Sequence, residues 1–177
     1  MPITNSTVYT VDTMVEYNRQ HLRQKKSLII IYAVATVVTL IVFALDRIIS
    51  FAYGDGSLDP FLLFALIFFV TVDVFYILFY TVLLKPIVKK DPMTDAQVDY
   101  SFTDECMEDH TTAKNLTQTT STKYDAIYKV VEGERYFYIY IAKNMAHIID
   151  KNGFKDGSPD MLRLVLAAHV DSKKRNF

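Results

Sequence analysis

The chain has 177 residues, of which 51% are apolar, and a formal net charge of −1. From Asp91 onward it carries eleven lysines and arginines against fourteen aspartates and glutamates, and this acidic balance excludes a nucleic-acid-binding module built on a basic face. A single cysteine, Cys106, excludes an intrachain disulfide and fits a reducing compartment.

Residues 1–27 are expected to form a cytosolic segment of their own, with one strand and one helix. Thr7 to Thr10 predicts a short extended piece, and Asp12 or Thr13 is placed to cap a helix that continues to Lys26. The apolar face of that helix is weak, so we interpret it as a cytosolic extension that enters the membrane. A helix lying along the inner leaflet is the alternative.

Two apolar runs follow, Leu28 to Leu45 and Phe61 to Leu84. Each is long enough to cross the hydrocarbon core of a bilayer, which needs about 20 helical residues. The first run is too long for a cleaved signal peptide and has no suitable cleavage site after it. Residues 28–84 therefore predict a transmembrane hairpin with helices at about 28–48 and 61–84, joined by a turn at Gly54-Asp55-Gly56.

The basic residues at the helix ends predict the orientation of this hairpin. Lysines and arginines are retained on the cytoplasmic side of a membrane. The segment from Asp46 to Pro60 holds three aspartates and one arginine, whereas basic residues flank the hairpin at Arg19, Arg23, Lys25 and Lys26 and at Lys85, Lys89 and Lys90. We therefore expect a multi-pass protein of the inner (cytoplasmic) membrane with both termini in the cytoplasm.

Polar and aromatic residues repeat along one face of each predicted membrane helix at spacings of three and four. If the helices pair antiparallel around Gly56, these faces meet. The predicted intramembrane polar lock consists of Asp73 opposite Thr39 and Tyr76 opposite Thr36, with Tyr32 opposite Tyr80 nearer the cytoplasmic interface.

Asp73 is the one carboxylate within the second run, and at the bilayer centre it costs about 2.5–3.5 kcal/mol on insertion scales. We favour a structural role, in which a neutral Asp73 is hydrogen-bonded to hydroxyl groups and locks the hairpin. The alternative is an ion or proton site in an oligomeric channel or transporter. Asp73→Asn distinguishes the two, because a lock tolerates the amide and a proton site does not.

Residues 91–177 are long enough for one small domain, and beyond Pro92 the apolar pattern changes from helical to alternating. Six short strands are predicted, at Val98–Phe102, Cys106–Thr112, Leu116–Lys123, Ala126–Val131, Tyr136–Ala142 and Met145–Asp150. Ser158-Pro159-Asp160 then has the pattern of a helix start, with serine as cap and proline in the first turn, for a helix that runs to about Val170.

These elements predict a small α+β domain, an antiparallel sheet or partial barrel covered by one C-terminal helix. The covering face of that helix is expected to be Met161, Leu162, Val165, Leu166 and His169.

Three stretches of this domain carry a family resemblance, namely Lys123 to Glu132, Tyr136 to Ile141, and Ile148 to Lys151 followed by Phe154. They resemble the C-terminal domain of the bacterial YcxB-like family. The resemblance implies two membrane helices joined to a small cytosolic domain similar to pleckstrin-homology-like (PH-like) modules. It implies no catalytic residues.

A catalytic or metal site is not expected in the domain, and no cofactor is expected. Cys106, Asp109 and His110 are close in sequence, and His147 with Asp150 could supplement them. On an alternating strand, however, Cys106 and Asp109 point to opposite faces, and no paired histidine or cysteine spacing is present.

The tyrosines of the fifth predicted strand are the candidate binding face. Tyr136, Tyr138 and Tyr140 alternate with apolar residues and so share one side of the strand. Tyrosine is common at interfaces because it combines apolar area with a polar tip. The alternative is that the C-terminal helix covers these rings as part of the core.

The sequence thus predicts a membrane-anchored, PH-like binding or regulatory module without catalytic activity. Its expected partners are the lipid bilayer, a cytosolic or membrane protein of unknown identity, or further copies of the chain. The alternative is the channel or transporter subunit that would use Asp73.

Overall fold

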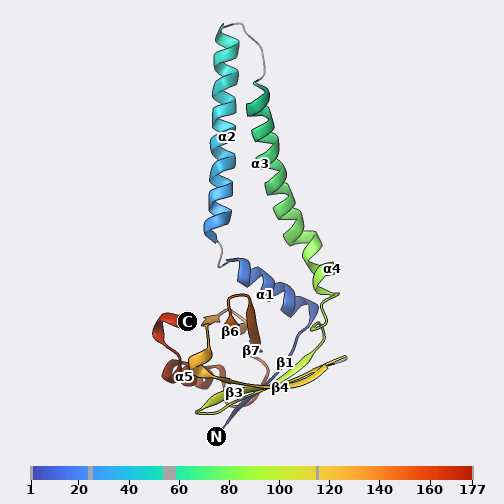
Figure 1. The fold of residues 1–177 in the computed structure, drawn as a ribbon, viewed down its shortest axis with the longest axis vertical. Coiled ribbons are helices and arrows are strands. Elements are labelled where there is room, and N and C mark those ends of the chain that lie inside the picture. The colour runs from blue at the N-terminus through green and yellow to red at the C-terminus, as the bar shows by residue number, and fades with distance from the viewer. Residues whose placement is uncertain (1, 24–25, 54–58, 115, 177) are drawn as a thin grey trace. The chain divides into compact units, whose positions relative to one another are not determined.

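The computed structural model describes residues 2–23, 26–53, 59–114 and 116–176, excepting the side chains of residues 23, 26–29 and 80. The chain divides into two compact units (Figure 1). Leu22–Leu84 forms a helical hairpin, and the sheet domain combines Met1–His21 with Lys85–Phe177. The N-terminal segment that the sequence sets apart is therefore part of the same unit as the C-terminal domain.

The hairpin consists of α2 (Lys26–Tyr53) and α3 (Pro60–Leu78), which run side by side in opposite directions (Figure 1). After α3 the chain continues through one π-helical turn, η1 (Phe79–Leu83), into α4 (Leu84–Val88). Ile30–Tyr53 and Pro60–Val88 are long and apolar enough to cross a membrane, with mean hydropathies of 2.0 and 2.6. Helix α2 is longer than the predicted 28–48, and the helical span Pro60–Val88 is longer than the predicted 61–84. The expected Gly54-Asp55-Gly56 turn lies outside the described residues.

The start of α3 is fixed by its own sequence. The Asp59 carboxylate accepts hydrogen bonds from the backbone N–H groups of Phe61 (2.8 Å) and Leu62 (3.2 Å), which have no partner within the helix. Pro60 occupies the first helical position, where the missing N–H costs nothing. Asp59 and Pro60 thus form an N-terminal capping motif for α3. The prediction from hydropathy alone started this helix one residue later, at Phe61.

The first sheet of the domain has five strands in the order β4-β3-β2-β1-β8. All of its pairings are antiparallel. Its strands are β1 (Ile3–Val8), β2 (Gln97–Phe102), β3 (Cys106–Ala113), β4 (Leu116–Lys123) and β8 (Phe154–Asp156). Strands β1, β2 and β3 have buried residues at alternate positions, so one face of this part of the sheet is core and the other is more exposed.

The second sheet has four strands in the order β7-β6-β5-β9. Its strands are β5 (Lys129–Glu132), β6 (Tyr136–Ala142), β7 (Met145–Asp150) and β9 (Arg175–Asn176). β6 is its central long strand, and residues 136–140 are all at most 1% exposed, which indicates that both faces of β6 are covered.

Side chains of β1 and of Tyr9 just after it connect the two sheets. They form hydrogen bonds with the backbone of β7, the edge strand of the second sheet. Tyr9 Oη accepts a hydrogen bond from the Ile148 N–H (3.0 Å), and Thr7 Oγ1 accepts one from the Asp150 N–H (2.9 Å). Asn5 Nδ2 donates to the Asp150 carbonyl at 2.8 Å. An edge strand exposes unpaired backbone groups, and these three bonds satisfy them from inside the protein.

Gly153 lets the turn after β7 lie directly against β1. The Ser6 N–H donates to the Gly153 carbonyl at 2.8 Å, and a Cβ at position 153 would lie only 2.3 Å from the Ser6 carbonyl oxygen. Any larger residue there would force the turn away from β1.

The helix α1 (Val11–Arg23) covers one face of the second sheet. The Tyr17 ring lies 6.1 Å from that of Tyr138 and 6.4 Å from that of Tyr140, and Thr13 Oγ1 is 3.2 Å from Tyr136 Oη. The cap of α1 is Thr10, whose hydroxyl accepts from the Thr13 N–H at 3.2 Å, so the cap is not Asp12 or Thr13 as predicted. The sequence predicted this helix either as an extension that enters the membrane or as a helix along the inner leaflet. Neither prediction included its packing against β6.

The helix α5 (Pro159–His169) packs through Leu162 and Leu166, both fully buried, and is capped by Ser158 as predicted. Of the predicted covering face, Met161 and His169 are exposed. Glu132 of β5 connects this helix to the second sheet, since its carboxylate accepts from Arg163 Nη2 at 2.7 Å and from Lys151 Nζ. These hydrogen bonds lower the pKa of Glu132, and the bond from Arg163 is the largest cause.

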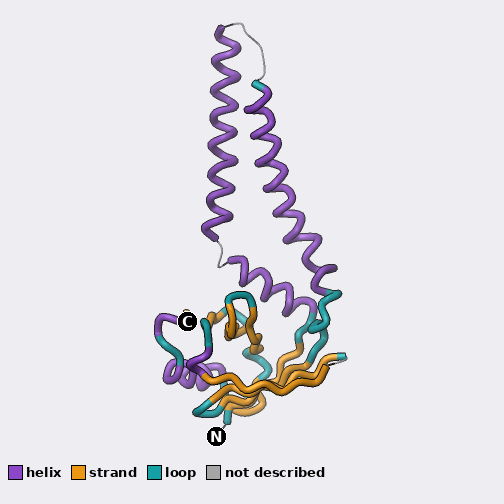
Figure 2. The backbone as a smooth tube through the Cα atoms, in the orientation of Figure 1, coloured by secondary structure: helices purple, strands orange, loops and turns teal. Residues whose placement is uncertain are grey.

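Most predicted strands are present, and three of them, Leu116–Lys123, Tyr136–Ala142 and Met145–Asp150, match to the residue. The prediction for Ala126–Val131 is wrong at its start, where a short 3-10 turn, η2 (Tyr124–Ala126), precedes β5. Figure 2 shows the sheet-rich C-terminal domain with its helix, the architecture expected from the sequence. The pairing of β1 between β2 and β8 in the first sheet was not predicted.

A fragment of residues 91–177 is expected not to fold, because it lacks β1 and α1. Without β1, the edge of β7 loses its hydrogen-bond partners. Without α1, Tyr138 and Tyr140, which are 1% exposed in the whole domain, become exposed. The matched control joins residues 1–21 to residues 85–177 through a glycine–serine linker and should fold. Near-ultraviolet circular dichroism of the tyrosines and cooperative urea unfolding provide the measurement; cooperative unfolding of the shorter fragment would contradict the expectation.

Candidate functional site

Among the described residues of the hairpin, Thr36 and Asp73 form a polar contact between the two helices. Thr36 Oγ1 of α2 donates to Asp73 Oδ2 of α3 at 2.8 Å and also lies 3.1 Å from the Tyr32 carbonyl oxygen one turn earlier. Thr36 is among the few buried polar residues, at 9% exposed. The hydroxyl thus gives the Asp73 carboxyl group a partner without leaving its own helix.

The predicted helix register is wrong by about one turn. Asp73 bonds Thr36 rather than Thr39, and Thr39 Oγ1 donates to the Ala35 carbonyl of its own helix at 2.9 Å. Consequently Tyr76 does not lie opposite Thr36 as expected. Tyr80, the predicted partner of Tyr32, has a side chain outside the described residues. The spacing of the polar residues on the two faces is compatible with both registers, because neighbouring turns of each helix offer similar polar side chains.

Thr36→Val should lower the stability of the hairpin by about 0.5–1.5 kcal/mol, because it leaves the Asp73 carboxyl group without its partner. Thr39→Val is the matched control and should change stability little, since the Thr39 hydroxyl bonds only its own helix. The measurement is unfolding of the full chain in mixed detergent micelles with increasing dodecyl sulfate, followed by far-ultraviolet circular dichroism. The reverse order of the two variants would restore the register predicted from the sequence.

The tyrosine row is not the exposed binding face that the sequence offered. Tyr136, Tyr138 and Tyr140 are each 1% exposed. Their rings belong to the core, as the alternative held, but α1 covers them rather than the C-terminal helix. Helix α5 lies on the opposite face, where the Arg163 guanidinium carbon stands 5.8 Å from the Phe137 ring centroid.

A cavity of about 500 Å³ lies within the sheet domain, with walls from α1, β3, β4, β7 and the end of β6. This volume is in the range of small-molecule sites. The wall is largely apolar, and its aliphatic side chains are Met14, Met93, Leu116, Ile141, Met145 and Ile148. Leu116 and Met145 are 46% and 60% exposed, so the cavity reaches the surface beside them.

Two titratable side chains from different sheets approach each other in the wall of this cavity. Asp109 comes from β3 and His147 from β7, and Asp109 Oδ1 lies 3.9 Å from His147 Nε2. Both atoms are buried and have no hydrogen-bond partner among the described residues. The other carboxylate oxygen, Asp109 Oδ2, accepts from Thr111 Oγ1 at 3.3 Å. An unpaired buried carboxylate oxygen is costly, which makes this pair a candidate site.

Burial governs the protonation of the groups around this pair. Desolvation lowers the pKa of His147, with the Asp109 carboxylate opposing that change, so the imidazole is held neutral at neutral pH. Tyr9 Oη and Tyr100 Oη share a hydrogen bond of 2.6 Å nearby. Burial raises the pKa of Tyr9 to about 12 and also raises that of Tyr100, so both remain neutral donors and acceptors.

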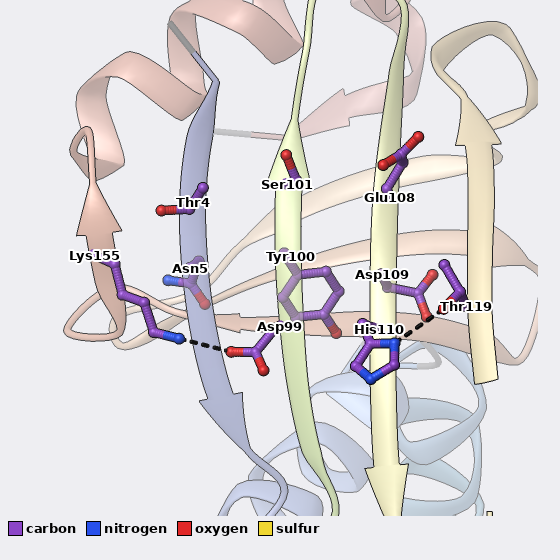
Figure 3. A pocket seen from close by; sticks show the side chains of 10 residues that line it. All are labelled: Thr4, Asn5, Asp99, Tyr100, Ser101, Glu108, Asp109, His110, Thr119 and Lys155. Atoms are coloured by element: carbon purple, nitrogen blue, oxygen red, sulfur yellow. Dashed lines mark hydrogen bonds and ion pairs between the residues drawn. The ribbon is translucent and has the colours of Figure 1, made fainter. Parts of the chain in front are cut away.

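The outer face of the first sheet carries a second, shallower hollow (Figure 3). Four of its polar side chains bond each other in pairs: Lys155 Nζ donates to Asp99 Oδ1 at 2.9 Å, and His110 Nδ1 lies 2.9 Å from Thr119 Oγ1. Asp109 lines this hollow as well as the inner cavity, but His147 lines only the inner cavity. We therefore take the inner cavity as the candidate site.

The alternation of β3 separates the residues that the sequence grouped as a conceivable metal site. Asp109 is buried toward the core, whereas His110 is exposed and Cys106 is only partly buried. Asp150 takes part in an ion pair with Arg135. Within the described ranges, no group of three or more histidine, cysteine, aspartate or glutamate side chains could hold a metal ion.

Comparison with known families gives one match. Residues 106–166, from β3 to α5, match the family model described as YcxB-like protein. The chain therefore contains a YcxB-like domain, which confirms the resemblance inferred from the sequence. Comparisons with curated proteins and with solved structures find no match.

Sequence reasoning considered Asp109 and His147 together but did not single out the pair. The available signal was the alternation of the two strands, which predicts that Asp109 faces the core beside Met107 and Thr111. What the sequence lacked was the approach of β7 to β3 across the domain, which depends on the way the two sheets join.

Proposed function

We propose that this protein is a membrane-anchored binding or regulatory module without catalytic activity, with the cavity beside Asp109 and His147 as its binding site. The hairpin spans the cytoplasmic membrane, and the sheet domain lies in the cytoplasm with both termini. The observation that carries the proposal is the buried Asp109 carboxylate, which has one unpaired oxygen at the wall of an apolar cavity.

The surface of the hairpin supports membrane anchoring. Large apolar side chains cover it, with Phe51 88%, Phe61 79% and Ile48 65% exposed. Exposed apolar surface of this extent is unfavourable in water and favourable in lipid. The basic residues that flank the hairpin support the proposed orientation.

The domain architecture supports a binding role rather than a catalytic one. Two sheets packed together with a C-terminal helix are the layout expected of a PH-like module, and we propose that assignment for the YcxB-like domain. Cys106, the single thiol of the chain, does not line the cavity. The residues that do line it offer an apolar chamber with one carboxylate and one neutral imidazole, groups suited to holding a ligand.

The proposed topology makes Cys106 reachable only from the cytoplasm. A membrane-impermeant thiol reagent should leave Cys106 unmodified in intact spheroplasts and label it after permeabilisation. The matched control is Tyr53→Cys in a Cys106→Ser background, because Tyr53 is 85% exposed at the far end of α2. That cysteine should be labelled in intact spheroplasts; the opposite labelling pattern for the two cysteines would refute the orientation.

Blocking the cavity should remove its ligand. Thr120 of β4 pairs with Asp109 and lines the cavity, whereas the adjacent Thr119 bonds His110 on the outer face. Full-length protein purified from membranes is denatured, and the released small molecules are identified by mass spectrometry. The wild type and Thr119→Trp should release a compound that Thr120→Trp lacks, and equal release from all three would argue against the cavity as the site.

A further inference from the structure

We propose that the cavity selects an amphiphile with a primary ammonium head, bound between Asp109 Oδ1 and His147 Nε2, and an apolar body in the chamber beyond. This inference rests on the proposed function and names the ligand class for the same site.

The charge of the cavity wall favours a cation. Among the described residues that line the cavity there is one carboxylate, Asp109, and neither lysine nor arginine. An anionic head would meet Asp109 without a compensating charge, whereas an ammonium group would form a charge-assisted hydrogen bond with its unpaired oxygen. The rings of Tyr9 and Tyr17 also line the cavity, and aromatic faces attract cations.

The geometry of the pair favours a group with several donor hydrogens. An ammonium group between the two atoms would hold the neutral His147 imidazole in the tautomer protonated on Nδ1, in which Nε2 accepts a hydrogen bond as Asp109 Oδ1 does. They are 3.9 Å apart, and one nitrogen placed about 2.8 Å from each can donate to both. An ammonium group has a third hydrogen left for a further acceptor. An alcohol has one hydrogen and can satisfy only one of the two atoms.

The aliphatic wall fits the apolar body of such a ligand and provides the means of entry. Both acceptor atoms are buried. Three methionines, Met14, Met93 and Met145, stand in the wall. Methionine has flexible, unbranched side chains that repack readily, so a small side-chain movement opens the pair to an entering amine.

The test compares three six-carbon probes that differ only in the head group, namely hexylamine, hexanol and hexanoate. Full-length protein in nanodiscs of neutral phosphatidylcholine is titrated near neutral pH by isothermal calorimetry, with empty nanodiscs as the blank. Hexylamine should bind at least about tenfold more tightly than hexanol, because its ammonium group forms a charge-assisted hydrogen bond that the alcohol cannot form. Hexanoate should bind more weakly than either.

Two variants assign the selectivity to Asp109. Asp109→Asn should lower the affinity for hexylamine to that for hexanol and leave hexanol unchanged. Glu108→Gln is the matched control, since Glu108 is an exposed carboxylate on the opposite face of the same strand, and it should alter nothing. Thr120→Trp should weaken binding of all probes.

The probe series in the wild type decides the matter even if a variant fails to fold. Hexanoate binding as tightly as hexylamine, or equal binding of hexylamine and hexanol, overturns the ammonium assignment while the binding cavity of the proposed function stands. Binding of none of the three probes overturns both.

Discussion

The fold of the sheet domain depends on the hydrogen bonds between β1 and the edge of β7. Asn5 and Thr7 are each 1% exposed, and with Tyr9 they satisfy the backbone of a strand that would otherwise end its sheet with unpaired groups inside the protein. β1 also forms the antiparallel ladder with β2, so a single strand from the N-terminus holds the two sheets together. Residues 91 onward therefore contain most of the domain but lack the strand that joins its halves.

The same joint creates the candidate site. Because β7 approaches the inner face of the first sheet, His147 comes within 3.9 Å of Asp109, a residue nearly forty positions earlier in the chain. Close packing would normally be expected to satisfy or exclude such groups, since an unpaired buried polar atom costs about 1–3 kcal/mol. The domain tolerates this cost beside an apolar cavity, and the proposed ligand site rests on this arrangement.

In the hairpin, a hydroxyl group and a carboxyl group form a polar contact between the two helices. Thr36 bonds Asp73 and its own helix at once, which gives the carboxyl group a partner within one chain. This bond favours a structural role for Asp73, and an ion or proton site in an oligomer remains the alternative that Asp73→Asn tests. The shift from Thr39 to Thr36 shows how weakly the polar spacing of an apolar helix determines register, since neighbouring turns offer similar faces.

The sequence by itself determined the elements that have a strong local signal. The two long apolar helices, the strands Leu116–Lys123 and Met145–Asp150, and the Ser158 cap of α5 follow from hydropathy, alternation and capping chemistry, which act over a few residues. The YcxB-like resemblance likewise follows from local pattern. Only the tertiary structure decided which helix covers Tyr138, where Asp73 finds its partner, and that Asp109 meets His147. Each of these is a contact between segments far apart in the chain, selected by the packing of whole sheets and helices, for which a local pattern carries no information.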